Sequence, residues 1–255
     1  MIDRNPGIFC PPAGSAFVEV HGRNISALLN PRPVVLIGSY KNRANFATVA
    51  WVTPLSHDPP LVAFALRPAS KTLQDVVDTG CFSVSTLDAS LLDTARLCGS
   101  RSGHTFDKGE QVAHSLEPHM PYRKPPASPT GRPADGRAAD PATGLAEGIA
   151  DAPCFKAPSP AARIPFVEGA LSILDCEVES VRASGDHSLV IGYVCRALTR
   201  CAADEDGAVF ATDTLLCTQH HHYTLGDPHC LESRKTADKG YRPTGKPQNY
   251  PRAHQ

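Results

Sequence analysis

The chain has 255 residues and a formal net charge of -1, and 41% of its residues are hydrophobic. This length and composition suit a globular protein with a sizeable core, built as one large domain or two small ones. A balanced charge offers no field of one sign to attract nucleic acid or an anionic membrane surface. No apolar run approaches the roughly 20 residues needed to cross a bilayer. We therefore expect neither a nucleic-acid partner nor a membrane span.

The cysteine pattern favours a reducing compartment. The nine cysteines form an odd set without any Cys-x-x-Cys pair, and Cys81, Cys176 and Cys195 fall inside apolar, strand-like runs. A buried free thiol behaves as a small hydrophobe. Met1 to Pro12 lacks the continuous apolar segment of a signal peptide. A cytoplasmic location is the expectation.

Prolines divide the chain into two ordered blocks. Residues 118–165 contain eleven of the 24 prolines, with Gly, Ala and Ser between them. Such a segment buries too little apolar surface to offset its ordering entropy, which predicts a mobile loop or linker. We predict one domain over residues 16–222, interrupted by this insertion at about 120–163, and a polar tail over 226–255.

The predicted elements are mostly strands. Short apolar or β-branched runs at 17–20, 33–37, 46–53 and 61–66 come first. A helix follows Ser70, where Thr72 and Asp75 have the spacing of a capping box. A strand at 81–87 and an amphipathic helix at 88–98 complete the first block, and the second has strands at 171–181, 189–198 and 209–217. No regular βαβ alternation is present, which favours a closed antiparallel barrel with helices at its rim.

The segment Arg67–Thr72 has the features of an anion site. It leaves a strand and opens a helix, whose first N–H groups are unpaired and carry a partial positive charge. Ser70 and Thr72 add hydroxyls, while Arg67 and Lys71 add charge. The alternative is an ordinary helix cap with two solvated cations.

The strand that begins at Asn45 is the second candidate. By period 2, Asn45, Ala47, Val49 and Trp51 face the same way. The small Ala47 side chain would let a flat ligand approach the backbone, and Trp51, the sole tryptophan, could stack on it. The alternative is a core strand whose tryptophan packs internally.

Two further segments are polar. The loop from Cys98 to Lys108, which contains Ser102, suits an anion or a polar ligand, or is a solvated connector. The turn at Gly185–His187 offers an imidazole for hydrogen bonding or proton transfer, or is a solvated turn. The histidines at 220–222 make a poor metal site, because adjacent residues of an extended segment face opposite ways; no metal site is predicted.

Together these segments resemble the flavin reductase-like FMN-binding split-barrel family, especially its flavoredoxin-like branch. The matching pieces, in order, are NPRPVVLIGS, NFATVAWVTPLSHDPPLVAFALRPASKT, CGSRSGHTFDK, ILDCEVES and GDHSLVIGYV. The resemblance covers roughly residues 16–110 and 164–222. Two departures stand out, namely the Pro-rich insertion and His104, which replaces the common Arg of an SGR segment.

The resemblance implies a mainly β fold, an FMN-binding split β-barrel of antiparallel Greek-key type with short flanking helices. It also implies a homodimer with FMN near the subunit interface. His187 and Trp51 would be catalytic, with His220 and Tyr223 as weaker candidates near the flavin. The cofactor-binding residues would be Asn45, Ala47, Thr48, Val49, Arg67, Ser70, Lys71, Thr72, Ser102 and Lys108.

The function implied by the resemblance is an NAD(P)H-dependent flavin reductase, in which NADH or NADPH passes hydride to FMN. Three alternatives stay open at this stage. One is a flavoredoxin-like electron carrier reduced by a protein partner, another is a non-enzymatic flavin-binding protein, and the third is a specialised flavoenzyme of secondary metabolism. No Rossmann fingerprint indicates which nicotinamide nucleotide is used.

Overall fold

The computed structural model describes residues 19–123, 155–200, 214–219 and 222–225. The predictions for the middle of the insertion, for residues 209–213, for His220 and His221, and for the tail at 226–255 fall outside these ranges. The elements are η1 (Gly22–Leu29), β1 (Arg32–Pro33), β2 (Val35–Tyr40), β3 (Ala44–Val49), β4 (Val52–His57), β5 (Pro60–Leu66), α1 (Lys71–Thr79), β6 (Cys81–Thr86), η2 (Ala89–Leu91), α2 (Leu92–Ser100), β7 (His114–Pro118), β8 (Arg163–Val167), β9 (Ser172–Ser184), β10 (His187–Thr199), β11 (Leu215–Gln219) and β12 (His222–Leu225).

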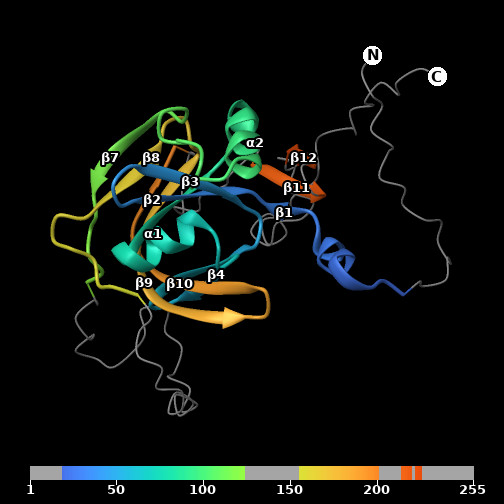
Figure 1. Ribbon diagram of the computed structural model, residues 1–255, viewed down its shortest axis with the longest axis horizontal. Coiled ribbons are helices and arrows are strands. Elements are labelled where there is room, and N and C mark those ends of the chain that lie inside the picture. The colour runs from blue at the N-terminus through green and yellow to red at the C-terminus, as the bar shows by residue number, and fades with distance from the viewer. Residues whose placement is uncertain (1–18, 124–154, 201–213, 220–221, 226–255) are drawn as a thin grey trace, which may run out of the picture.

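The centre of the fold is a seven-stranded sheet in the order β3-β2-β6-β9-β10-β5-β4, and every pairing in it is antiparallel. Its two edge strands, β3 and β4, are consecutive in the chain. The amide of Ala65 on β5 donates to the carbonyl of Trp51, at the corner between β3 and β4, over 3.0 Å. The sheet thus curves until its edges meet, with β7–β8 and β11–β12 on opposite sides of it (Figure 1). The predicted antiparallel, mainly β fold with short helices is confirmed.

The inside of the curved sheet is filled by aliphatic and aromatic side chains. Phe64 and Phe82 lie at its centre in an edge-to-face arrangement, with ring centroids 5.0 Å apart. The cluster also takes Leu73 and Val76 from α1, so this helix covers one opening of the barrel. The buried members are Val35, Ile37, Ala47, Val49, Val62, Phe64, Leu73, Val76, Phe82, Val84, Cys176, Val178 and Val190.

A second core lies on the outer face of β2 and β3. Leu36 and Phe46 point into it, and Ala95 and Cys98 of α2 pack against them. Because β2 is covered on both faces, residues 35–39 are all buried. Its sequence is accordingly a continuous apolar run rather than an alternating one. This second core holds α2 beside β3, which matters for the site described below.

Three sequence predictions need correction. The single strand expected at 46–53 is two strands, because the chain turns at Ala50 and Trp51. The strand expected at 17–20 is not formed by its described residues, Glu19 and Val20. The helix after Ser70 is present as α1, but the expected capping box is not, because Thr72 and Asp75 have other partners (see below).

Both ends of the Pro-rich insertion are integrated into the fold. Strands β7 and β8, which flank it, pair with each other. The Lys156 amide donates to the carbonyl of Val77 over 2.8 Å, next to the C-terminus of α1, where Gly80 has the positive φ of 72° typical of helix ends. The prediction of a mobile linker therefore does not hold for residues 118–123 and 155–165; residues 124–154 lie outside the described ranges.

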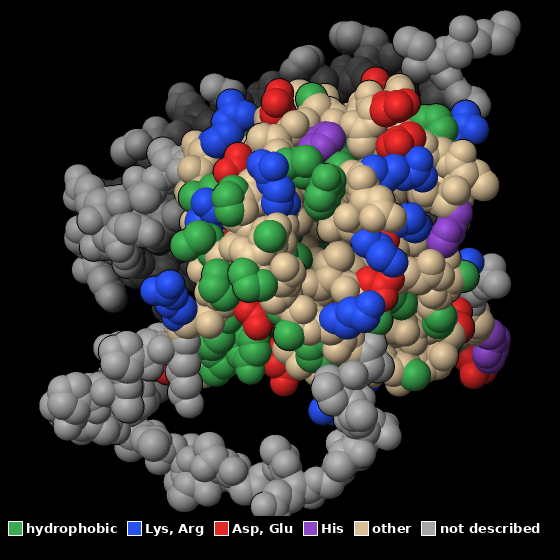
Figure 2. Space-filling model, turned by 60° about the vertical axis from the view of Figure 1, so that its left-hand side comes forward, with side chains coloured by type: hydrophobic (Ala, Val, Ile, Leu, Met, Phe, Trp, Pro, Cys, Tyr) green, Lys and Arg blue, Asp and Glu red, His purple; other side chains and the backbone are tan. Residues whose placement is uncertain are grey.

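The molecular surface fits the balanced composition. On the face shown in Figure 2, Lys and Arg side chains are interspersed with acidic ones. Among the described residues, no helix has the length and hydropathy needed to span a bilayer.

Candidate functional site

A cavity of about 190 Å³ lies where α1, β3, α2 and the loop after α2 converge. Strand β3 contributes Ala47 and Thr48 to its wall, and the second core keeps α2 against this strand. Its lining residues are Ala47, Thr48, Ala69, Ser70, Lys71, Thr72, Cys98, Gly99, Arg101, Ser102, Gly103 and Lys108. Four segments that are distant in the sequence thus enclose one small polar space.

The N-terminus of α1 opens into this cavity. Ser70 is the N-cap residue, with extended backbone angles, and its side chain makes no capping hydrogen bond. The first intrahelical bond runs from the Gln74 amide to the Ser70 carbonyl. The amides of residues 71–73 therefore have no partner within the helix, and they carry the positive end of the helix dipole. The Ser70 hydroxyl and these amides form a donor set suited to an oxyanion.

The Lys71 ammonium does not face the cavity as a free charge. It lies 2.5 and 2.6 Å from the two carboxylate oxygens of Asp75, one helical turn later. Asp75 is only 1% exposed and also accepts from the Ser39 hydroxyl over 3.3 Å. A buried carboxylate needs a compensating charge. Lys71 supplies it, so the pair leaves little net charge for a ligand.

Arg101 and Lys108 are the remaining cations in the cavity wall, and they differ in kind. Arg101 is exposed, and its guanidinium lies 5.7 Å from the centre of the Phe106 ring. Lys108 is 5% exposed, and its ammonium donates to the carbonyls of Phe46 over 2.8 Å and Cys98 over 2.7 Å. Burial lowers the pKa of Lys108 below its usual 10.5. Lys108 thus joins β3 to the end of α2, whereas Arg101 is free to bind an anion.

Asn45 lies beneath the loop that follows α2. It is 2% exposed, and its amide group donates to the Thr72 hydroxyl over 2.8 Å, while its carbonyl oxygen Oδ1 has no hydrogen-bond partner. Gly103 lies directly against this oxygen, and any Cβ at position 103 would overlap it. The loop therefore approaches β3 this closely because residue 103 has no side chain.

The loop is fastened on both sides of Gly103. The His104 ring lies 3.1 Å from the carbonyl of Ala69, at the opposite rim of the cavity. The Arg43 guanidinium donates to the carbonyl of Gly103 over 2.9 Å and to the Asp107 carboxylate over 2.9 Å. His104 thus has a positional role, which its place in the sequence did not predict.

Trp51 and His187 form a separate aromatic pair. Their ring centroids are 4.7 Å apart with planes inclined by 35°, and the Arg32 guanidinium lies 5.8 Å from the Trp51 ring. His187 Nδ1 lies 2.8 Å from the Asp186 carboxylate, whose pKa is lowered mainly by this hydrogen bond. Trp51 is 41% exposed, so the alternative of an internal core tryptophan does not apply.

The structure brings together seven of the twelve site residues expected from the sequence: Ala47, Thr48, Ser70, Lys71, Thr72, Ser102 and Lys108. Asn45 supports them from behind, and Val49 packs in the barrel core. Arg67, Trp51 and His187 do not line the cavity, and Tyr223 packs against the second core. The period-2 prediction that Trp51 shares the face of Asn45 and Ala47 is wrong, because β3 ends at Val49.

Arg101 and Gly103 were not among the predicted residues, although both belong to the polar loop singled out in the sequence. The sequence shows Arg101 and Lys108 as the two Arg or Lys residues of that loop, but only the structure shows that Lys108 is buried and bonded. The requirement for glycine at 103 depends on Asn45, 58 positions earlier, and no local pattern signals it.

Comparison with known families shows which family part of the chain resembles. Residues 28–135 match the family model described as "Flavin reductase like domain". These residues are therefore similar to the flavin reductase like family. The match includes every residue that lines the cavity. The resemblance inferred from the sequence motifs is confirmed.

Relatives of the flavin reductase like domain are distant in sequence. The chain is 30% identical over 97 residues to an Escherichia coli protein, "Uncharacterized protein YddH", and the match covers 37% of this chain and 51% of that protein. The chain thus spans about half the length of this curated relative.

Solved structures share the fold. An FMN-binding protein from Thermus thermophilus is 22% identical with a TM-score of 0.59, covering 86% of this chain and 98% of its own. Flavoredoxin from Methanosarcina acetivorans is 16% identical with a TM-score of 0.62, covering 89% and 100%. A Streptomyces globisporus NADH:FAD oxidoreductase in complex with NAD and FAD fragments is 18% identical with a TM-score of 0.52, covering 79% and 88%.

Proposed function

We propose that this chain is an FMN-binding oxidoreductase that takes hydride from NADH or NADPH. The observation that carries the proposal is the convergence of the α1 N-terminus, the Ser70 hydroxyl and Arg101 on one small cavity beside β3. The match of residues 28–135 to the flavin reductase like family model supports it, as does the shared fold with an FMN-binding protein and an NADH:FAD oxidoreductase.

The residues present fit the phosphate end of FMN. Backbone amides at a helix N-terminus, a hydroxyl without a capping bond and a free guanidinium are typical phosphate donors. A cavity of about 190 Å³ is smaller than the roughly 300–1,000 Å³ usual for a whole ligand. It would accept the phosphate and the adjoining ribityl chain, held by Ser70, Thr72, Arg101 and Ser102. The Lys71–Asp75 pair would position this helix start rather than contribute a net charge.

The ring system would then extend along β3 toward Trp51. Trp51 lies three positions after Thr48 of the cavity wall, just past the end of β3. When bound, FMN supplies the two-electron redox chemistry. Trp51 and His187 would provide a flat, semi-exposed surface against which a nicotinamide can pack, with His187 held in place by Asp186. The main task of these side chains would be to keep the reacting atoms about 3–3.5 Å apart.

The phosphate assignment is tested by comparing FMN with riboflavin, which lacks the phosphate. Arg101→Ala should weaken FMN binding roughly 10- to 100-fold, because a charge-assisted hydrogen bond contributes about 1.5–3 kcal/mol. Riboflavin binding should not change. The matched control is Arg96→Ala, on the exposed face of α2 beside Asp93. Equal losses for FMN and riboflavin would contradict the assignment.

The donor is tested by anaerobic titration of the flavin-loaded full-length chain with NADH and NADPH. Stoichiometric bleaching of the flavin absorbance is expected, and Trp51→Ala and His187→Ala should slow it without loosening FMN. The shared fold with flavoredoxin favours one alternative, an electron carrier reduced by a protein. Absence of bleaching by either nucleotide would favour that carrier. Light scattering after gel filtration tests the proposed homodimer.

A further inference from the structure

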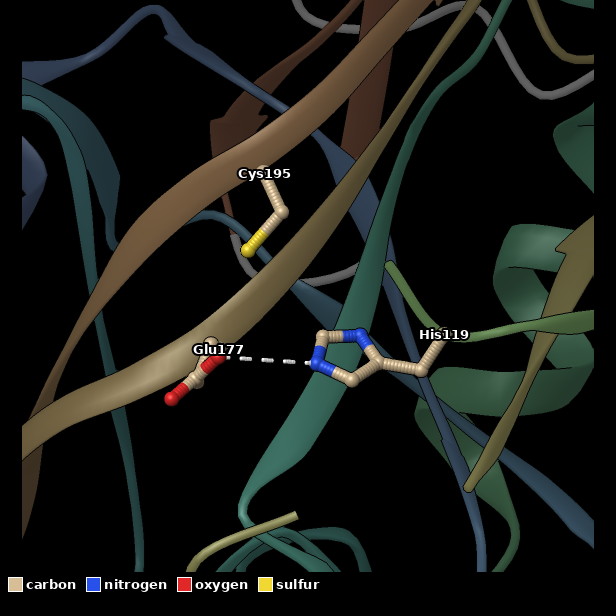
Figure 3. Close-up of side chains that lie close together, drawn as sticks. All are labelled: His119, Glu177 and Cys195. Carbon is tan, nitrogen blue, oxygen red and sulfur yellow. Dashed lines mark ion pairs between the residues drawn. The ribbon is translucent and has the colours of Figure 1, made fainter. Parts of the chain in front are cut away.

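His119, Glu177 and Cys195 converge on the outside of the barrel, away from the cavity described above. One imidazole nitrogen, one carboxylate oxygen and the thiol sulfur of these residues all lie within 4.8 Å of one another. The three side chains come from different parts of the chain, namely the segment after β7, strand β9 and strand β10 (Figure 3).

The sheet geometry explains why the two strand residues meet. Asp175 and Glu177 are two positions apart on β9 and so share the outer face, while Cys176 between them points into the barrel core. On β10, Val194 pairs with Cys176 and Arg196 with Asp175, which leaves Cys195 as the extra residue of a β-bulge. Because Val194 packs against the barrel core, Cys195 next to it faces the outer side of the sheet, as Glu177 does.

His119 reaches the cluster because its segment is docked on these carboxylates. The Met120 amide donates to Asp175 over 2.8 Å, and the Tyr122 amide donates to Glu177 over 3.0 Å. The Tyr122 ring stacks on Tyr193 of β10, with centroids 4.3 Å apart and planes inclined by 12°. The histidine is therefore fixed on the outer face of β9 and β10.

One nitrogen of His119 has no partner. The side chain is 2% exposed, and its Nδ1 lies 2.6 Å from the Asp175 carboxylate. Its Nε2 is buried without a hydrogen bond, and Glu177 lies 3.8 Å away, too far for one. Buried polar atoms are rarely left unpaired in proteins. A carboxylate on one nitrogen and a vacant second nitrogen is the arrangement that orients a metal-binding histidine.

The charges around His119 also favour a bound cation. Asp175, which is fully buried, and Glu177 place two carboxylates on this one ring, and the nearest cation among the described residues is Arg196, 3.8 Å from Asp175. Arg196 also lies over the Phe166 ring at 5.0 Å. Asp175 is fully buried, Glu177 is 27% exposed, and the one nearby cation is imperfectly placed, so a bound cation would compensate the negative charge at this ring.

We propose that His119 Nε2, the Glu177 carboxylate and Cys195 Sγ bind a divalent transition metal of the Zn²⁺ class, with Asp175 as the positioning residue. Imidazole, carboxylate and thiolate are all common zinc ligands. Tetrahedral zinc would place these ligand atoms roughly 3.3–3.8 Å apart, so side-chain shifts of about 1 Å complete the site. A cavity of about 370 Å³, bordered by Cys195, Met120 and Tyr122, adjoins the Cys195 side of the cluster. The thiol proton is released to solvent when the metal binds. The bound metal would tie residues 119–122 to the barrel.

The experiment is equilibrium dialysis of the full-length, flavin-loaded chain against Zn²⁺, with bound metal measured by mass spectrometry and by zinc X-ray absorption, which the flavin does not disturb. One equivalent is expected, with one sulfur at about 2.3 Å and nitrogen or oxygen ligands at about 2.0–2.1 Å. Cys195→Ser should remove the sulfur contribution, and Asp175→Asn should weaken binding roughly 10- to 100-fold.

Matched controls separate this site from other thiols and histidines. Cys217→Ser and His57→Ala should bind Zn²⁺ as the wild type does, and so should a variant with His220, His221 and His222 all replaced by alanine. Loss of the metal in that triple variant, a sulfur contribution that persists in Cys195→Ser, or no sulfur in the wild-type spectrum would each overturn the proposal. The wild-type spectrum decides the question if Cys195→Ser fails to fold.

Discussion

Replacing Lys108 by methionine would show how much the buried ammonium holds the site together. In the wild type it donates to the carbonyls of Phe46 and Cys98 over 2.8 and 2.7 Å. Methionine has a similar shape but no donor, so two buried carbonyls lose their partner. Each such loss costs about 1–3 kcal/mol, partly offset because no charge is buried. We expect the free energy of unfolding to fall by about 2–4 kcal/mol.

Urea denaturation followed by circular dichroism measures this change, with Lys41→Met as the control. Lys41 also makes a short ion pair, 2.6 Å from Asp78, but on the surface, where such pairs contribute little. A loss for Lys108→Met no larger than that for Lys41→Met would refute the structural role of the buried ammonium. FMN binding should weaken as well, because Phe46 and Cys98 adjoin two walls of the cavity.

The pH dependence of this difference provides a second check. Burial lowers the pKa of Lys108 in the folded protein below 10.5. Between that lowered pKa and 10.5, the unfolded chain therefore binds more protons than the folded one. Folding stability then rises with pH through this group. The stability advantage of the wild type over Lys108→Met should thus widen as the pH approaches 10.5.

Two other predictions concern the cavity wall. Gly103→Ala should weaken FMN binding about 10-fold or more in a fluorescence titration, because the added methyl overlaps Asn45 Oδ1. Gly99→Ala, whose methyl would lie 3.4 Å from Thr48, should retain binding, and equal effects of the two variants would argue against the close contact. Burial raises the pKa of the Cys98 thiol to about 11. At pH 8 only about one molecule in a thousand carries the thiolate, so peptide mass spectrometry should find Cys98 unmodified by iodoacetamide under conditions that label exposed thiols; rapid labelling would contradict its burial.

Local patterns in the sequence were sufficient to find most of the elements and the segments that enclose the cavity. Apolar alternation and turn residues predicted most strands, and the helix after Ser70 begins where the sequence indicates. The segment 45–72 and the loop ending at Lys108 were both singled out, and both enclose the cavity. These predictions succeed because backbone hydrogen bonding and the side-chain periods of strands and helices depend on residues close together in the chain.

Contacts between distant segments decided what each side chain does. The sequence suggested that Lys71 binds a ligand. In the structure the Lys71 ammonium instead neutralises the Asp75 carboxylate, which is buried against Ser39. The Lys108 ammonium donates hydrogen bonds to backbone carbonyls. Trp51 does not share the face of β3, because the sheet closes at the corner where Trp51 lies.

The same holds for the metal site that we propose, because the pairing of β9 with β10 and the docking of residues 119–122 bring His119 to Glu177 and Cys195. Local sequence patterns located most elements and the segments that enclose the cavity. The tertiary structure decided which charged side chains can bind a ligand. A buried charge must pair with the group that packs beside it, and that group can be distant in the chain.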